Sequence, residues 1–372
     1  MFSVAIELGG ADATKHYAPL AVSPALRGFA VEGSQLRLPG AHAAAQDHVS
    51  ITALAARWCP TGRDLYLPKR RNVHVSSWER NVLGKVVDSL LVQLHLIGLN
   101  VLEDAFETEV QDGGGVDIDA AAAAIREQGQ TVASNLLAEW EFEGGDKAFK
   151  NASLDHFAES MAPHGGPQLV DGTARALFSL VDHETGLLQK HIKQREAAGG
   201  DWMAEVRATL TRLQTGLKLD SEKFPAKVFG VTSGVRPDFV YAVTLVGDLK
   251  VGPHHEFYDT VATGYVIFAE YVLQRRINTA AILAVDLDLN AGSVKAHEVR
   301  VIHPDNDLRT RWLAQRDSAL QTYGLADEPR HPVDTAPCKT CPYRPACWVG
   351  GEVDGTPIID GQPRPTGPGG SA

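Results

Sequence analysis

The chain lacks several features that would place it in a class at once. Its 372 residues include only four cysteines, three of them within ten residues, and in a reducing compartment such a cluster indicates metal binding and not disulfides. No apolar run approaches the length of a membrane span. The first twelve residues lack the basic start and the long apolar stretch of a signal peptide. We therefore expect a cytoplasmic protein without a membrane partner.

Positive charge is also scarce. Lys and Arg number 35 against 46 Asp and Glu, which gives a net charge of −11. This balance argues against a general nucleic-acid coat protein, because phosphate binding requires local positive charge. It does not exclude a nuclease, since bound cations offset the charge of metal-binding carboxylates. Residues 69–71 and 275–276 are the candidate basic segments, and both are equally compatible with solvated surface charge.

The order of the expected elements indicates the fold class. The hydrophobic content of 44% allows a core to form. Helical spacing of apolar residues and runs of β-branched residues predict both helices and strands. Helices are expected over residues 77–95, 120–143, 154–161, 173–197, 201–217 and 307–323, and strands over 227–232, 235–243, 244–251, 280–289 and 294–302. A further helix between the third and fourth strands is expected to be capped by Asp259 and to bury Val261, Tyr265, Phe268 and Val272. The pattern predicts an α/β core with a helical insert.

The sharpest catalytic motif is RPDFVYAVTLVGDLKVG, residues 236–252. Asp248 and Lys250 are two apart on one strand and therefore share a face, and a short hairpin can bring Asp238 beside them. Two carboxylates suit a hard divalent cation such as Mg or Mn, to which the backbone carbonyl of Leu249 is a natural further ligand. Lys250 can orient the attacking water or stabilise the transition state of phosphodiester hydrolysis. The alternative is a pair of exposed acids beside an ordinary surface lysine.

A third acid is available from the predicted helix 77–95. Asp88 follows Gly84 by one turn and lies among apolar neighbours. It is a candidate metal ligand, and the competing interpretation is a solvated acid on the helix surface.

The four cysteines form the second motif. Cys338, Cys341 and Cys347 have the spacing C-x2-C-x5-C, and Cys59 lies nearly 280 residues earlier. Thiolates at these spacings suit a soft metal or an iron–sulfur cluster that ties the two ends of the chain together. A structural zinc site or four unrelated buried cysteines are the alternatives.

Together the motifs resemble the RecB-like iron–sulfur nucleases of the PD-(D/E)xK superfamily, and within them the CRISPR-associated exonuclease family, in its variant branch known mainly from archaeal type I systems. The resemblance rests on CPTGRDLYL from Cys59, GKVVD from Gly84, RPDF from Arg236, GDLKVG from Gly247, TGYVIFAE from Thr263 and the cysteine triplet.

The resemblance implies a restriction-endonuclease-like α/β nuclease core with a 4Fe–4S cluster. Members cut single-stranded DNA ends with Mg or Mn and help to trim and orient prespacers for the integrase of CRISPR antiviral defence. By position, Asp238 and Asp248 would bind the metal, Lys250 would be catalytic and the four cysteines would hold the cluster. Two positions depart from the family pattern.

The first departure is Asp88, which lies where the family commonly has histidine. The second is Val261, which lies at the glutamine of the motif Gln-x3-Tyr, whereas Tyr265 fits its tyrosine. Glu270 on the same helix is a candidate substitute in positioning DNA.

These motifs divide the chain into six expected segments: 1–58 (N-terminal segment), 59–110 (first part of the nuclease core), 111–222 (helical insert), 223–335 (core with the catalytic hairpin), 336–350 (cluster segment) and 351–372 (disordered tail). The expected function is that of a hydrolase of the exodeoxyribonuclease type, that is, a metal-dependent DNA exonuclease acting in spacer acquisition together with the CRISPR integrase complex. A DNA repair or recombination nuclease and a catalytically weak iron–sulfur scaffold are the alternatives.

Overall fold

The structure of the chain is a computed structural model. It describes residues 1–9, 15–17, 19–28, 49–55, 59–71, 78–112, 116–140, 152–153, 167–199, 201–211, 217–219, 224, 226–231, 235–241, 245–253, 255–333, 338, 341, 343, 347, 352–353 and 356–357. The helix expected over residues 154–161 lies outside these described residues.

Helices and strands alternate in a mixed architecture, which confirms the α/β class. The helices are α1 (Phe2–Gly9), α2 (Ile51–Ala55), α3 (Arg63–Arg70), α4 (Trp78–Asp112), α5 (Ile118–Ala138), α7 (Pro167–Ala197), α8 (Trp202–Thr211), α9 (Phe257–Leu273) and α10 (Asn306–Gly324), with short 3-10 turns at η2 (Pro24–Leu26) and η6 (Ala226–Phe229). The strands are β1 (Glu139–Trp140), β2 (Ala152–Ser153), β3 (Leu217–Leu219), β4 (Phe239–Tyr241), β5 (Leu245–Val251), β6 (Thr279–Asp288), β7 (Ser293–Ile302), β8 (Glu352–Val353) and β9 (Thr356–Pro357).

A five-stranded sheet with the order β3-β4-β5-β6-β7 is the centre of the fold. Neighbouring strands in this sheet are antiparallel except β5 and β6. These two run parallel and are joined by the crossover helix α9. The apolar runs of β5 and β6 are buried along most of their length, as expected of strands covered on both faces.

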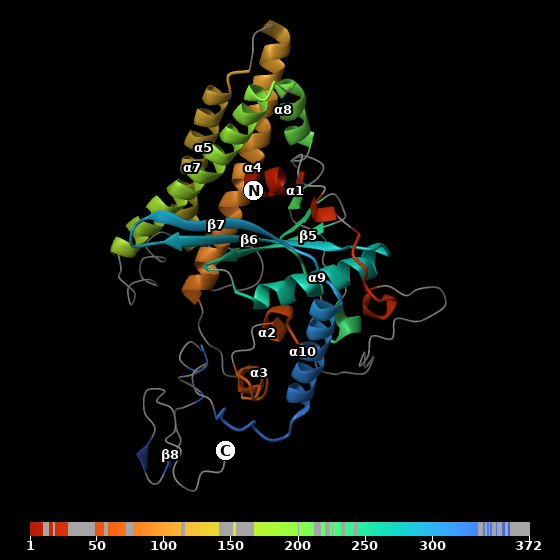
Figure 1. Cartoon of the computed structure of the whole chain (residues 1–372). Coiled ribbons are helices and arrows are strands. Elements are labelled where there is room, and N and C mark those ends of the chain that lie inside the picture. The colour runs from red at the N-terminus through yellow and green to blue at the C-terminus, as the bar shows by residue number, and fades with distance from the viewer. Residues whose placement is uncertain are drawn as a thin grey trace.

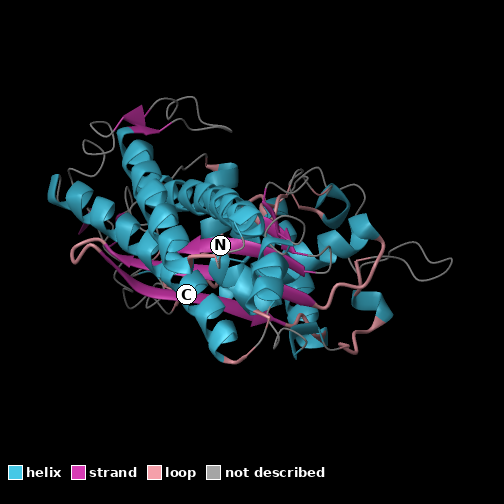
Figure 2. Ribbon diagram, turned by 90° about the horizontal axis from the view of Figure 1, so that it is seen from above, coloured by secondary structure: helices cyan, strands magenta, loops and turns pink. Residues whose placement is uncertain are grey.

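Helices cover both faces of this sheet. In Figure 1, α4, α5 and α7 lie on one side of the strands, and α9, α10, α2 and α3 lie on the other. Figure 2, in which the molecule is viewed from above, shows the long helices lying across the strands. Alternate strand residues therefore enter two separate cores: Leu245 packs into the cluster with α4 and α7, and Val246 packs into the cluster with α9 and α10.

The helical insert shares its core with the sheet. Ile125 of α5 and Leu180 of α7 belong to the same buried cluster as Leu90 of α4 and Leu283 of β6. The helix α4 continues to Asp112, well beyond the expected end at residue 95. Its stretch Leu83–Thr108 is long and apolar enough to cross a membrane by length and composition alone, but half of that window is buried inside the protein, as in a core helix.

Several local predictions were wrong. The described part of the strand expected over 227–232 is not a strand: Ala226–Phe229 is a 3-10 turn followed by Gly230, whose φ of 73° favours glycine. The helix expected to reach residue 143 ends at Ala138, where β1 begins.

The crossover helix also differs from expectation. Glu256 occupies the N-cap position of α9 without a capping hydrogen bond from its side chain, and Asp259 lies inside the first turn. Val272 is 38% exposed and does not belong to the inward face. Within the tail expected to be disordered, β8 and β9 form a short antiparallel pair.

Candidate functional site

The hairpin formed by β4 and β5 positions the acidic residues. Phe239 pairs with Gly247 in the register of these strands. A side chain at Gly247 would overlap the ring of Phe239, so glycine is required for this close approach. Asp238 immediately precedes β4, and its Oδ2 accepts a hydrogen bond of 2.6 Å from the backbone N–H of Leu249. The hairpin thereby holds Asp238 beside the middle of β5.

Asp248 and Lys250 form an ion pair on one face of β5. Asp248 is 2% exposed, so its charge is removed from water and compensated by the ammonium group. The Nζ of Lys250 also lies 3.3 Å from the backbone carbonyl oxygen of Leu249, to which it donates. The carbonyl expected to bind a metal is thus placed at the site, where it contacts the lysine. These contacts exclude the alternative of exposed surface acids.

Electrostatic coupling links these groups to α4. Burial, followed by the charge of Asp248, raises the pKa of Asp238 well above its ordinary value. Burial also raises the pKa of Asp88, against the opposing effect of Lys85, and Asp248 raises it further. Three carboxylates from α4, β5 and the residue before β4 therefore repel one another in a partly desolvated space.

The neighbouring carboxylates stabilise the charged form of Lys250. Burial alone would lower the pKa of Lys250, but the charges of Asp248 and Asp238 raise it above the ordinary value. Lys250 is therefore an ammonium group at neutral pH.

The helix α9 places two tyrosines near the acids. Burial, followed by the charges of Asp248 and Asp238, raises the pKa of Tyr265. The ring of Tyr258 lies 5.8 Å from the Nζ of Lys250. Val261, at the position expected to carry glutamine, is 1% exposed and packs in the apolar core. Tyr258 was missed by the sequence analysis, because the predicted helix was expected to begin at Asp259, one residue later, whereas α9 begins at Phe257.

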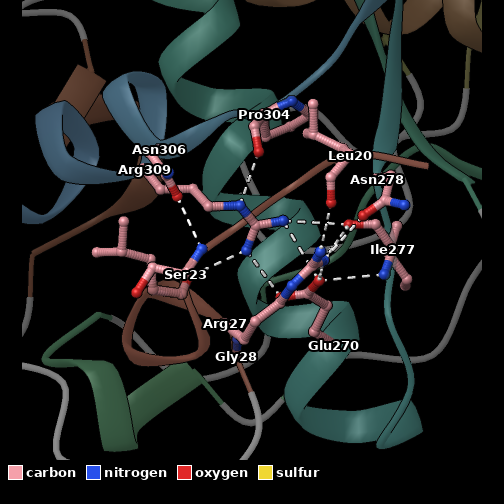
Figure 3. Close-up of polar contacts among 11 residues, drawn as sticks. Leu20, Ser23, Arg27, Gly28, Glu270, Ile277, Asn278, Pro304, Asn306 and Arg309 are labelled. Atoms are coloured by element: carbon pink, nitrogen blue, oxygen red, sulfur yellow. Dashed lines mark hydrogen bonds and ion pairs between the residues drawn. The ribbon is translucent and has the colours of Figure 1, made fainter. Parts of the chain in front are cut away.

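Glu270 lies elsewhere on α9 and has a structural environment. It is 0% exposed and forms ion pairs with Arg27 and Arg309, as Figure 3 shows. The backbone N–H groups of Gly28 and Ile277 donate to its carboxylate as well. A side chain enclosed in this way has no surface to offer to DNA, so the expected DNA-positioning role of Glu270 is not compatible with the structure.

The four cysteines from the two ends of the chain lie near one another. All are free thiols: Cys59 and Cys338 are buried, and Cys341 and Cys347 are half-buried. Burial raises the pKa of Cys341 to about 11, to which the charges of Cys59 and Cys338 contribute. Burial also raises the pKa of Cys347, with a contribution from Cys59.

Arg63 is a further residue of the cysteine site that the sequence analysis did not single out. It is buried, and its Nε donates to the Sγ of Cys347 at 3.1 Å. The same guanidinium forms an ion pair with Glu328. Its place in the motif CPTGRDLYL, one turn after Cys59, was the available signal.

Neither the acidic site nor the cysteine site has its described side chains arranged to hold a metal ion. Among the residues that the structure describes, no group of three or more His, Cys, Asp or Glu side chains is positioned to hold a metal ion. The basic segment 69–71 is occupied by contacts within the protein, since Arg70 donates to the carbonyl of Tyr323 and Arg71 pairs with Glu328. Arg275 and Arg276 are exposed.

Fold and site define a class: an α/β protein with a carboxylate–lysine cluster on the parallel strand of its sheet. Residues 217–349, a little over a third of the chain, match the sequence model of the family described as CRISPR-associated exonuclease Csa1. This match supports the expected resemblance to a CRISPR-associated exonuclease family over that part of the chain, which includes the acids of the hairpin, Lys250 and the cysteine triplet. A search of the curated proteins found no match to the chain.

Proposed function

We propose that the protein is a metal-dependent DNA nuclease of the PD-(D/E)xK type that degrades single-stranded DNA from its ends. The observation that carries this proposal is the convergence of Asp238, Asp248 and Lys250 on the β4–β5 hairpin. The family match to an exonuclease supports it. We further propose that it acts in the cytoplasm during CRISPR spacer acquisition, beside the integrase complex, as the resemblance to the variant archaeal branch implies.

The carboxylates fit a divalent cation. The charge of Asp248 raises the pKa values of Asp238 and Asp88, and Asp88 also raises that of Asp238; a bound cation would relieve this repulsion. These three side chains and the carbonyl of Leu249 are the groups that would hold Mg or Mn. When bound, such a cation supplies charge neutralisation at the scissile phosphate and acidifies water.

Lys250 supplies a fixed positive charge in this proposal. Its raised pKa keeps the proton on Nζ, so the group serves as an electrostatic stabiliser of the phosphate and not as a general base. The ion pair with Asp248 fixes the direction of the ammonium group before substrate arrives. Tyr265 remains a phenol, because the adjacent carboxylates oppose its ionisation.

The cysteine site fits an iron–sulfur cluster. Four free thiols within electrostatic reach of one another are the donor set of a 4Fe–4S cluster. We propose that Cys59, Cys338, Cys341 and Cys347 hold it and so join α3 to the chain after α10. Iron analysis and visible absorption of anaerobically purified protein test this part; a colourless protein with stoichiometric zinc contradicts it.

Cleavage of end-labelled single-stranded DNA in the presence of Mn tests the nuclease. Asp248→Asn and Lys250→Gln retain the shape of the side chains but remove their charges, and each is expected to lower the rate at least about 100-fold. Lys295→Gln is the matched control, because its ammonium pairs with Asp286 at an exposed position of β7. Equal rates for the wild type and both variants contradict the proposal.

The scaffold alternative has one observation in its favour. Val261 is buried in the apolar core, so the position offers no polar side chain to align a DNA strand. If the wild type degrades DNA as slowly as the Asp248→Asn variant yet binds it, the protein acts as a DNA-binding scaffold.

A further inference from the structure

Three aromatic rings contact one another where the connection from β5 enters the first turn of α9. The rings of His255 and Phe257 are nearly parallel, at 9°, with centroids 5.2 Å apart. The ring of Tyr258 meets both edge-on, with centroids 5.6 Å from His255 and 4.5 Å from Phe257. We call these three residues the aromatic stack.

The aromatic stack runs from solvent to the acidic site. His255 is exposed, Phe257 is half-buried and Tyr258 is buried. The buried member is the one whose ring lies 5.8 Å from the Nζ of Lys250. The contacts with Tyr258 therefore hold the outer rings near Lys250, with His255 as the exposed member.

The aromatic stack lies beyond the carboxyl end of a parallel strand. The β5 strand runs parallel to β6, and the aromatic stack follows the carboxyl end of β5. In open, mostly parallel α/β sheets, ligands bind in crevices outside the carboxyl ends of the strands, and β5 and β6 are the parallel pair of this sheet. The turn at Gly252, with a φ of 114°, directs the chain away from the strand at this end.

We propose that the aromatic stack is a subsite for an unpaired nucleobase of the DNA whose phosphate lies at Asp248 and Lys250. This inference rests on the proposed nuclease function and adds a means of selecting single strands. Aromatic rings bind unpaired bases by stacking, which tolerates any sequence because every base has a π-face. A base in a duplex is already stacked on its neighbours and is withheld from the subsite.

The test compares the binding of intact single strands with that of strands lacking one base. Binding is measured by fluorescence anisotropy with labelled oligothymidylate in Ca²⁺, and with the same strand carrying one abasic residue at successive positions from each end. The wild type is expected to lose about 10-fold in affinity when the abasic residue occupies the subsite. His255→Ala and Phe257→Leu are expected to bind all these strands equally, because the base has lost its stacking partner.

Phe106→Leu is the matched control. Phe106 lies on α4, where Arg207 covers its ring, and this variant is expected to discriminate abasic strands as the wild type does. Melting temperatures of all variants report whether each one folds, and Phe257→Leu retains an apolar side chain at the half-buried position.

Two results overturn the subsite: a wild type indifferent to abasic residues at every position, or folded variants that keep the wild-type discrimination. Failure of the nuclease proposal looks different. In that case the wild type does not cleave DNA in Mn²⁺, while the anisotropy experiment in Ca²⁺ still reports whether the aromatic stack binds a base.

Discussion

The backbone N–H of Leu249 donates a hydrogen bond of 2.6 Å to the carboxylate of Asp238. This contact joins the residue before β4 to the middle of β5 and fixes one carboxylate beside the ion pair of Asp248 and Lys250. Strand register thus brings the acidic side chains together. Repulsion between their charges lowers the stability of the metal-free protein.

Removing one of these charges is expected to stabilise the metal-free protein. The pKa of Asp238 is raised, so the unfolded chain loses its proton at lower pH than the folded chain does, and folding becomes less favourable as pH rises above about 4. At pH 8 in EDTA, Asp238→Asn is expected to raise the melting temperature by about 2–4 °C.

Calorimetry with and without Mn²⁺ checks this prediction. Mn²⁺ should raise the melting temperature of the wild type and have little effect on Asp238→Asn, because the variant has lost a ligand. A lower melting temperature for the metal-free variant at pH 8 would show that the charge repulsion is not the dominant effect.

The buried network around Glu270 is expected to be essential for stability. Glu270→Gln leaves Arg27 and Arg309 as two buried guanidinium groups without their carboxylate, which should cost about 3–5 kcal/mol. Urea denaturation measures the loss. Arg300→Met is the matched control: its pair with Asp259 is 43% exposed on the arginine side, and its removal should cost less than about 1 kcal/mol.

The thiol of Cys341 is expected to be unreactive in the metal-free protein. Its pKa of about 11 means that only a small fraction is thiolate at pH 8, and the thiolate is the reactive form. Alkylation by iodoacetamide, followed by peptide mass spectrometry, should accelerate as pH approaches 11. Rapid, pH-independent modification above pH 8 would contradict the burial of this group.

Two glycines should respond in opposite ways to alanine. Gly247→Ala places a methyl group against the ring of Phe239 and should destabilise the hairpin by about 1–3 kcal/mol and reduce cleavage. Gly84→Ala on α4 meets no atom within 4 Å, and helix propensity favours it by up to about 1 kcal/mol. Thermal unfolding of both variants checks the pair, and a tolerated Gly247→Ala would argue against the observed register.

Much of the site was predictable because its signals are local. The i and i+2 spacing of Asp248 and Lys250 places them on one strand face, and the short connection to Asp238 favours a hairpin. The helical spacing of apolar residues predicted α4, although not its end at Asp112, because packing against α5 extends the helix beyond the predicted segment.

The strand expected over residues 227–232 shows where local signals fail. Its apolar residues suggested a strand, but Phe229 enters the core from a 3-10 turn and packs at a tilt against the ring of Phe268 of α9. Burial was predicted correctly there, while the backbone conformation was set by the helix against which it packs.

The sequence by itself determined the carboxylates, the lysine and the cysteine spacing, since these depend on residue type and short separations. Only the tertiary structure decided what each buried charge faces. Arg27 meets Glu270 across 243 residues, and Arg63 reaches Cys347 across 284. Such pairings depend on how helices and sheet pack, because a charge removed from water is stable only where the fold brings its partner.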